Sequence, residues 1–276
     1  MKWGLALGGG GVPGVAAHLG FVRSLFAEGL VPDVMVGTSA GGLVAGALAA
    51  GIPINALCMA WTDVVRDPYG LMTEEAINAI RLLRPELIPG AFDLYSVVSD
   101  VLCHDAMRGF HSVKNWNPGY GVTTTDMVLL SPQLIHSENP IVTYTDNALV
   151  ATAAFPPIFE GVLSNDKHLL VDGGVFDMVP VGRCKELGAE KVVAVKIGEA
   201  SKLMPMEKIS AEQLASLVVG SLLDRANAST NPSADLEITV HTAGGLLSLG
   251  SFETDYTEGS AIASINIQKI KRLVNG

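Results

Sequence analysis

The chain has 276 residues, of which 49% are hydrophobic and 17% charged, a composition that suits one large globular domain with a sizeable core. Its net charge of −10 argues against nucleic acid as a partner, which requires a basic face, and against constitutive attraction to anionic membranes. The sequence has no apolar stretch as long as the roughly 18 residues that span a bilayer.

The first predicted elements enclose a glycine-rich segment. Trp3 to Leu7 is a short apolar run typical of a strand, Gly8 to Gly14 is rich in glycine, and Val15 to Glu28 has the apolar spacing of a helix. A glycine loop between a strand and a helix N-terminus exposes several backbone N–H groups and forms an anion site. Two uses are open at this point: binding of a dinucleotide phosphate, or an oxyanion hole for acyl transfer.

The dinucleotide interpretation depends on the next strand. Gly9, Gly11 and Gly14 do satisfy G-x-G-x-x-G, but that fingerprint expects an acidic residue at the end of the second strand. Here Asp33 precedes the predicted strand Val34 to Val36, which is the wrong end. The oxyanion interpretation is therefore favoured, and no cofactor is expected.

The second strand leads into the pentapeptide Gly37-Thr38-Ser39-Ala40-Gly41, which has the form G-x-S-x-G. Small, helix-compatible residues follow from Gly42 to Ala50, so the context is strand, sharp turn and helix. Such a turn lifts the serine Oγ clear of the sheet, and the helix N-terminus favours developing negative charge. The pattern predicts a nucleophile elbow at Ser39. For the pentapeptide taken alone, an ordinary tight turn is the alternative.

A third motif, Asp172-Gly173-Gly174, follows the apolar run His168 to Val171. The aspartate is thus expected at a strand end, and the glycines permit a turn and the close approach of another backbone. A plain β-turn, in which Asp-Gly is common, is the alternative for this motif alone.

In this order, the three motifs resemble those of the patatin-like phospholipases, in particular the short bacterial members. The similarity extends to residues 121–126, 148–159, 179–181, 187–189 and the tail from Ala234, and it is weakest over about 61–117. The resemblance implies a Ser–Asp dyad with Ser39 as nucleophile and Asp172 as its base, since serine needs a nearby proton acceptor and burial strengthens a carboxylate as a base. It also implies further site residues. Gly8, Gly9, Gly10 and Gly11 would hold the oxyanion, and Gly14, Gly37, Gly41, Gly173 and Gly174 are the motif glycines.

One position departs from the family pattern. Pro13 stands where the family usually has Arg or Lys, and proline supplies neither a charge nor an N–H, although it suits a helix start. We therefore expect the substrate to be a lipid or other acyl ester, with general ester hydrolysis favoured over strong phospholipase activity. Pro13 also supports a second hypothesis, a catalytically weak scaffold or regulator, against which the intact Ser39 and Asp172 argue.

A Ser-His-Asp triad is the mechanistic alternative. The chain has six histidines, and the α/β-hydrolase order Ser, Asp, His leaves His241 as the only one after Asp172. His241 ends a predicted strand, and a plain polar residue at a strand end is the favoured interpretation.

Alternating β and α segments predict an α/β fold, a three-layer α/β/α sandwich with a mostly parallel central sheet, related in logic to the α/β-hydrolases. We expect one domain over 1–276, with a helical cap at about 61–117 above Ser39 that selects the acyl chain. The later predicted elements are a strand over 191–197 and helices over 210–228 and 256–274. All three motifs then fall at the carboxyl ends of strands.

The sequence also leads to expectations about the cellular compartment and the binding partners of the protein. Met1-Lys2-Trp3 leads directly into the first strand, so a cytoplasmic location is expected, and the scattered Cys58, Cys103 and Cys184 fit a reducing compartment. No metal site and no nucleic-acid partner are expected. Transient contact with a membrane or micelle, and a homodimer, both stay open.

Overall fold

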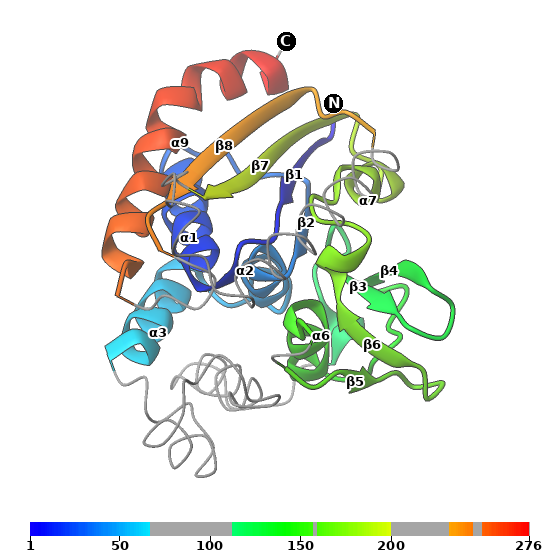
Figure 1. Ribbon diagram of the computed structural model, residues 1–276. Helices are drawn as coiled ribbons and strands as arrows, with labels where there is room; N and C mark the ends of the chain where they lie inside the picture. The colour runs from blue at the N-terminus through cyan, green and yellow to red at the C-terminus, as the bar shows by residue number, and fades with distance from the viewer. Residues whose placement is uncertain (67–111, 157–158, 200–231, 245–249, 276) are drawn as a thin grey trace, which may run out of the picture.

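The computed structural model describes residues 1–66, 112–156, 159–199, 232–244 and 250–275 (Figure 1). The predicted helix over 210–228 and residues 67–111 of the cap predicted over about 61–117 lie outside these residues. The described strands are β1 (Trp3–Leu7), β2 (Val34–Thr38), β3 (Tyr120–Asp126), β4 (Ser131–His136), β5 (Val162–Leu163), β6 (Leu169–Asp172), β7 (Lys191–Glu199) and β8 (Leu236–Thr242). The described helices are α1 (Gly11–Ala27), α2 (Ala40–Ala49), α3 (Ile54–Arg66), α6 (Thr145–Ala153), α7 (Val181–Glu186) and α9 (Phe252–Asn275), with 3₁₀ turns η3 (Val113–Asn115) and η4 (Gly173–Val175).

The strands form one mixed sheet. Strands β3, β2, β1, β7 and β8 lie side by side in that order and run parallel, while β4, β5 and β6 add antiparallel pairs next to β3. All residues of β1, β2 and β3 are buried, as expected of parallel strands covered on both faces. β8 alternates buried and more accessible residues instead. The predicted α/β fold with a mostly parallel sheet is confirmed.

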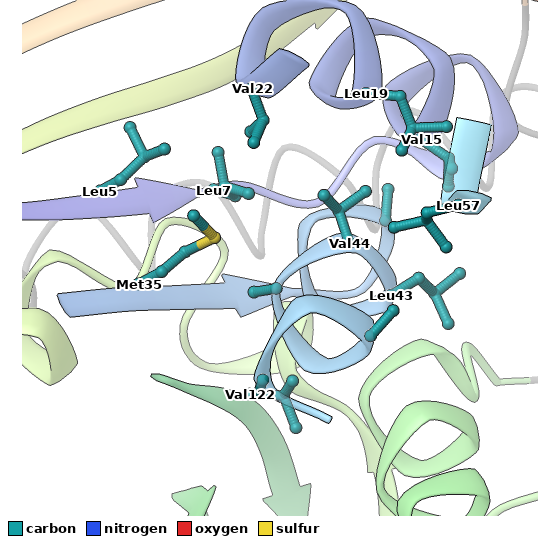
Figure 2. Close-up of a cluster of buried hydrophobic side chains, with 14 of the residues drawn as sticks. Leu5, Leu7, Val15, Leu19, Val22, Met35, Leu43, Val44, Leu57 and Val122 are labelled. Carbon is teal, nitrogen blue, oxygen red and sulfur yellow. The ribbon is translucent and has the colours of Figure 1, made fainter. Parts of the chain in front are cut away.

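Helices cover both faces of this sheet. Leu5, Leu7 and Met35 point toward α1 and α2 on one face, where they pack with apolar side chains of those helices (Figure 2). Their strand neighbours Ala6 and Val36 point to the opposite face and pack beneath α7. Since each fully buried Leu or Val contributes about 1.5–3 kcal/mol, the alternation fixes the register of the sheet as well as its three layers.

Helix α9 lies along α1 (Figure 1). Two glycines bring the helix backbones into close approach: a Cβ on Gly20 of α1 would meet the carbonyl oxygen of Tyr256, and one on Gly259 of α9 would meet that of Ala17. The outer side of α1 therefore fits α9 closely. Within the described residues no helix is both long and apolar enough to cross a membrane.

The pairing register around β3 decides where the carboxyl ends of β2 and β6 meet. β4 pairs with β3 along Gly121 to Asp126, so β2 and β6 must share the opposite edge of β3. β2 ends with Thr38 opposite Thr123, and the antiparallel β6 ends with Asp172 opposite Thr124. The two strands therefore run toward each other along β3, and their carboxyl ends meet at adjacent residues.

Candidate active site

Ser39 follows the last residue of β2 and precedes α2, at the sharp turn that the sequence predicts. Its backbone has φ 52° and ψ −119°, a conformation that non-glycine residues rarely adopt and that clusters at functional sites. Two glycines make the turn possible. A Cβ on Gly37 would collide with the carbonyl of Gly41, and a Cβ on Gly41 would collide with the carbonyl of Leu7 in β1.

Thr152 in α6 holds the backbone of Ser39. The Ser39 N–H lies 3.1 Å from both the carbonyl oxygen and the Oγ1 of Thr152. The Thr152 hydroxyl in turn donates to the carbonyl of Thr123 on β3, at 2.6 Å. Thr152 belongs to none of the three sequence motifs, although it lies inside the segment 148–159 that resembles the family. These hydrogen bonds explain how an unusual backbone conformation is maintained at Ser39.

Asp172 and Ser39 are brought together by the meeting of β6 and β2. The Asp172 carboxylate is 2% exposed and accepts hydrogen bonds from the Gly174 N–H at 2.7 Å and from the Ser39 side chain. Burial raises the pKa of Asp172 to about 6, although both hydrogen bonds act to lower it. A carboxylate of this kind is ionised at neutral pH and is a stronger base than an exposed aspartate.

The glycine segment is shorter as a loop than the sequence suggests, because α1 begins at Gly11 rather than at Val15. Pro13 therefore lies in the first turn of α1, where a helix makes no use of its missing N–H. The fixed φ of proline fits this position, so the departure from the family pattern is compatible with the fold.

The four glycines proposed for the oxyanion hole differ in their hydrogen bonds. The N–H of Gly8 donates to the Val195 carbonyl at 2.9 Å, and the N–H of Gly9 donates to the Met178 carbonyl at 3.0 Å. Among the described residues, the N–H groups of Gly10 and Gly11 have no partner. They stand at the N-terminus of α1, where unpaired donors and the helix dipole favour an anion.

His18 of α1 supports the glycine loop, a role that no motif in the sequence indicates. It is fully buried, and its Nε2 lies 2.7 Å from the Gly8 carbonyl oxygen, which also accepts the Gly41 N–H at 3.2 Å. Burial lowers the pKa of His18 to about 4, although the hydrogen bond to Gly8 acts to raise it, so the ring is neutral. Nε2 must carry the proton, and Nδ1 has no partner in the described part of the chain. His18 thus ties the glycine loop to the elbow.

The segment after Asp172 is held by a short chain of hydroxyl groups. Thr38 donates to the carbonyl of Asp177 at 2.7 Å, so the Thr123 hydroxyl must be the donor in its own 2.7 Å contact with Thr38. The buried Asp177 carboxylate lies 3.4 Å from Arg183 Nε. These contacts fix the turn that follows Asp172 at the end of β6.

Met178 lies next to Ser39, between the glycine loop at Gly9 and the turn at Gly174. A Cβ added at Gly9 would lie 2.7 Å from the Met178 sulfur and 3.4 Å from Ser39 Cβ, and a Cβ added at Gly174 would lie 3.1 Å from the Met178 methyl. A partly exposed thioether therefore lines the surroundings of Ser39, and such a flexible apolar side chain suits contact with an acyl chain.

His241 does not join this site. It lies on β8, and the strand order β2-β1-β7-β8 puts it three strand spacings from Ser39, about 14 Å. The order of strands therefore argues against the triad alternative. Among the described residues, no group of three or more His, Cys, Asp or Glu side chains is arranged to hold a metal ion.

Comparison with known proteins identifies the family that this chain resembles. The family model described as patatin-like phospholipase matches residues 5–184. The lysophospholipase NTE1 of Scheffersomyces stipitis is 30% identical over 211 residues, covering 74% of this chain and 12% of that protein. The neuropathy target esterase sws of Drosophila melanogaster is 28% identical over 195 residues, covering 71% of this chain and 13% of that protein.

These curated relatives are much longer than the present chain, which matches only about an eighth of their length. Among solved structures, VipD from Legionella pneumophila is similar with a TM-score of 0.55 at 13% identity, over 97% of this chain and 66% of that chain. At this identity the likeness concerns the fold alone.

Proposed function

Since the chain belongs to the patatin-like phospholipase family, we propose that it is a serine acyl hydrolase that cleaves lipid or related carboxylic esters with Ser39 and Asp172. The observation that carries this proposal is the hydrogen bond from the Ser39 side chain to a buried carboxylate whose pKa is raised to about 6. A nucleophile at a strained turn, next to a base and a helix N-terminus, is the arrangement that acyl transfer requires.

The proposed reaction has two halves. Ser39 Oγ attacks the ester carbonyl carbon while its proton passes to Asp172, and the bond to the alcohol then breaks as Asp172 returns the proton to the leaving oxygen. Water next attacks the acyl group on Ser39 and gives a proton to Asp172. The free acid departs as Asp172 returns that proton to Ser39 Oγ. The hydrogen bond from Gly174 to Asp172 orients the carboxylate for both transfers.

The oxyanion of both tetrahedral intermediates is assigned in this proposal to the N–H groups of Gly10 and Gly11. These donors stay available because those of Gly8 and Gly9 serve the backbone. Each such donor contributes about 2.7–4 kcal/mol to catalysis. His18 has a positioning role, since its hydrogen bond to the Gly8 carbonyl fixes the start of the loop.

Pro13 supports a narrower proposal for the class of substrate. With proline in the first turn of α1, that position offers no cation to an anionic head group. We expect short acyl esters to be turned over faster than phospholipid in vesicles, although one relative is named a lysophospholipase. Comparable rates on both substrates would contradict this expectation. The scaffold hypothesis is disfavoured by the intact contact between Ser39 and Asp172.

Labelling with a fluorophosphonate probe tests the nucleophile. The wild-type protein should be labelled, and Ser39→Ala should abolish both labelling and hydrolysis of p-nitrophenyl esters, because it removes the proposed nucleophile. Ser264→Ala, which removes an exposed hydroxyl on α9, is the matched control and should be labelled normally. If folded wild-type protein is not labelled, the scaffold hypothesis takes precedence. His241→Ala should keep its activity.

The pH dependence of hydrolysis follows from Asp172. With a pKa of about 6, the carboxylate can accept the serine proton only above that pH, so kcat/KM for a neutral ester should rise through a midpoint near pH 6 and level off above pH 7. His18, with a pKa of about 4, contributes no step in this range. A profile that is flat between pH 5 and 7 would show that Asp172 is not the base.

A further inference from the structure

Exposed hydrophobic side chains gather at one place on this protein. Among the described residues eleven large hydrophobic side chains are exposed, and six of them belong to two neighbouring hairpins. We call this group the hairpin patch. It consists of Met127 (41% exposed), Val128 (60%), Leu129 (58%), Leu130 (63%), Leu163 (58%) and Leu169 (42%). Single exposed hydrophobic residues are normal, whereas a contiguous patch marks an interaction site.

The sheet holds the patch together. Residues 127–130 form the tip between β3 and β4, and the Met127 N–H donates to the Leu169 carbonyl at 2.9 Å. Leu169 is paired in register with Leu163 of β5. Both hairpins lie on the side of the sheet away from β8 (Figure 1). Met127, Leu169 and Leu163 therefore lie at neighbouring positions across three strands, and the exposed apolar residues 128–130 follow Met127 directly.

Three of the four backbone N–H groups at the tip have acceptors within the protein. Asp126, which is 4% exposed, accepts the N–H groups of Val128 and Leu129 on Oδ1, at 2.8 and 2.9 Å. Its Oδ2 lies 2.8 Å from His168 Nδ1, which keeps the carboxylate itself paired. The N–H groups at 127, 128 and 129 thus need no water. Entry of a segment into an apolar medium requires internally satisfied donors of this kind.

The patch lies close to the candidate active site. Leu169 stands three residues before Asp172 on the same strand, a distance of about 10 Å along β6. The tip extends β3 beyond Thr124, the residue opposite Asp172, and so lies at the end of the sheet where β2 delivers Ser39. A binding partner that covers the hairpin patch would therefore lie beside the ends of β2 and β6, where Ser39 and Asp172 are located.

We propose that the hairpin patch docks the protein onto a neutral, zwitterionic phospholipid surface. This inference rests on the proposed function, because a hydrolase of lipid esters must meet its substrate at such a surface. Residues 127–130 carry no charge, and a net charge of −10 disfavours both an anionic bilayer and a second copy of the same chain. The tip also offers no charged side chain for electrostatic pairing with a protein partner.

Vesicle binding tests the proposal. Ser39→Ala protein, which cannot consume the lipid, is mixed with phosphatidylcholine vesicles and sedimented. In that background, Leu129→Asp combined with Leu130→Asp should lower the partition coefficient at least about 10-fold. Leu130 has φ 49°, a conformation that aspartate tolerates better than leucine, so the folded state should survive. Ile265→Asp on α9, where the side chain is 70% exposed, is the matched control and should bind like the parent.

The outcomes separate this inference from the proposed function. Equal binding of parent and double variant, or no binding by the parent, would overturn the docking proposal. So would a parent that elutes as a dimer when the double variant elutes as a monomer, because a second copy would then cover the patch. With Ser39 restored, the double variant should hydrolyse short soluble esters at the wild-type rate. Absence of that activity in the wild type would refute the proposed function but not the docking.

Discussion

Asp172→Asn is expected to lower kcat/KM for short p-nitrophenyl esters by about 10²–10⁴-fold. The amide has the shape of the carboxylate, and its oxygen can still accept the Gly174 N–H that Asp172 accepts at 2.7 Å. It cannot take the proton of Ser39, so the nucleophile loses its base. Labelling by a fluorophosphonate should slow to a similar extent, and the rise of activity near pH 6 should disappear from what remains.

The same substitution should leave the protein at least as stable at neutral pH. Below about pH 4 the Asp172 carboxyl is protonated in both the folded and the unfolded chain, whose ordinary pKa is 3.8. Between pH 4 and 6 the folded state retains the proton while the unfolded state loses it, so stability falls as the pH rises. At pH 7 the buried charge costs on the order of 2–3 kcal/mol, and asparagine avoids this cost.

Thermal melts at pH 4 and pH 7 distinguish loss of a base from loss of structure. The melting temperature of Asp172→Asn should equal or exceed that of the wild type at pH 7, and the advantage should shrink toward pH 4. A variant that melts well below the wild type at pH 7 would mean that the carboxylate is needed for the fold, and its lost activity would then say nothing about proton transfer.

Gly41→Ala should destabilise the fold by more than about 4 kcal/mol, which is a large share of the 5–15 kcal/mol that folded domains possess. The added Cβ would fall against the carbonyl group of Leu7. Both the helix backbone at Gly41 and the strand backbone at Leu7 are fixed by the sheet, so neither can rotate away as a side chain would. The midpoint of denaturant unfolding measures this effect.

Gly250→Ala is the matched control, because a Cβ there meets no described residue within 4 Å and the backbone has no positive φ. Its unfolding midpoint should be within error of the wild type or slightly higher, as fewer unfolded conformations become accessible. If Gly41→Ala unfolds at the same denaturant concentration as Gly250→Ala, the close contact between α2 and β1 does not have the importance that the structure gives it.

Local patterns predicted the elements that depend on local chemistry. The apolar run to Val36 and the glycines around Ser39 predict a strand, a turn and a helix, since each glycine is needed by its own immediate surroundings. The parallel sheet followed from the alternation of elements, and the structure confirms it. Boundaries were less accurate, because a helix that starts inside a glycine motif, as α1 does at Gly11, has no signal that distinguishes it from a loop.

Features that depend on distant partners could not be predicted. Nothing near Gly8 or Gly9 in the sequence reveals that Val195 and Met178 occupy their N–H groups. The end-to-end meeting of β2 and β6 along β3 likewise depends on register across the sheet, and so does the burial of His18. The residues of the site were therefore proposed from motifs, while the hydrogen bonds that support them required the structure.

The close fit of Gly20 and Gly259 has a consequence for the order in which the chain folds during its synthesis. A ribosome completes α1 early and α9 only after Ser39, Asp172 and both glycine turns have been made. Until α9 has been made, the side of α1 that packs against α9 stays exposed, and α1 begins at the loop proposed to bind the oxyanion. A newly made chain is therefore expected to complete the packing around α1 only after α9 has left the ribosome.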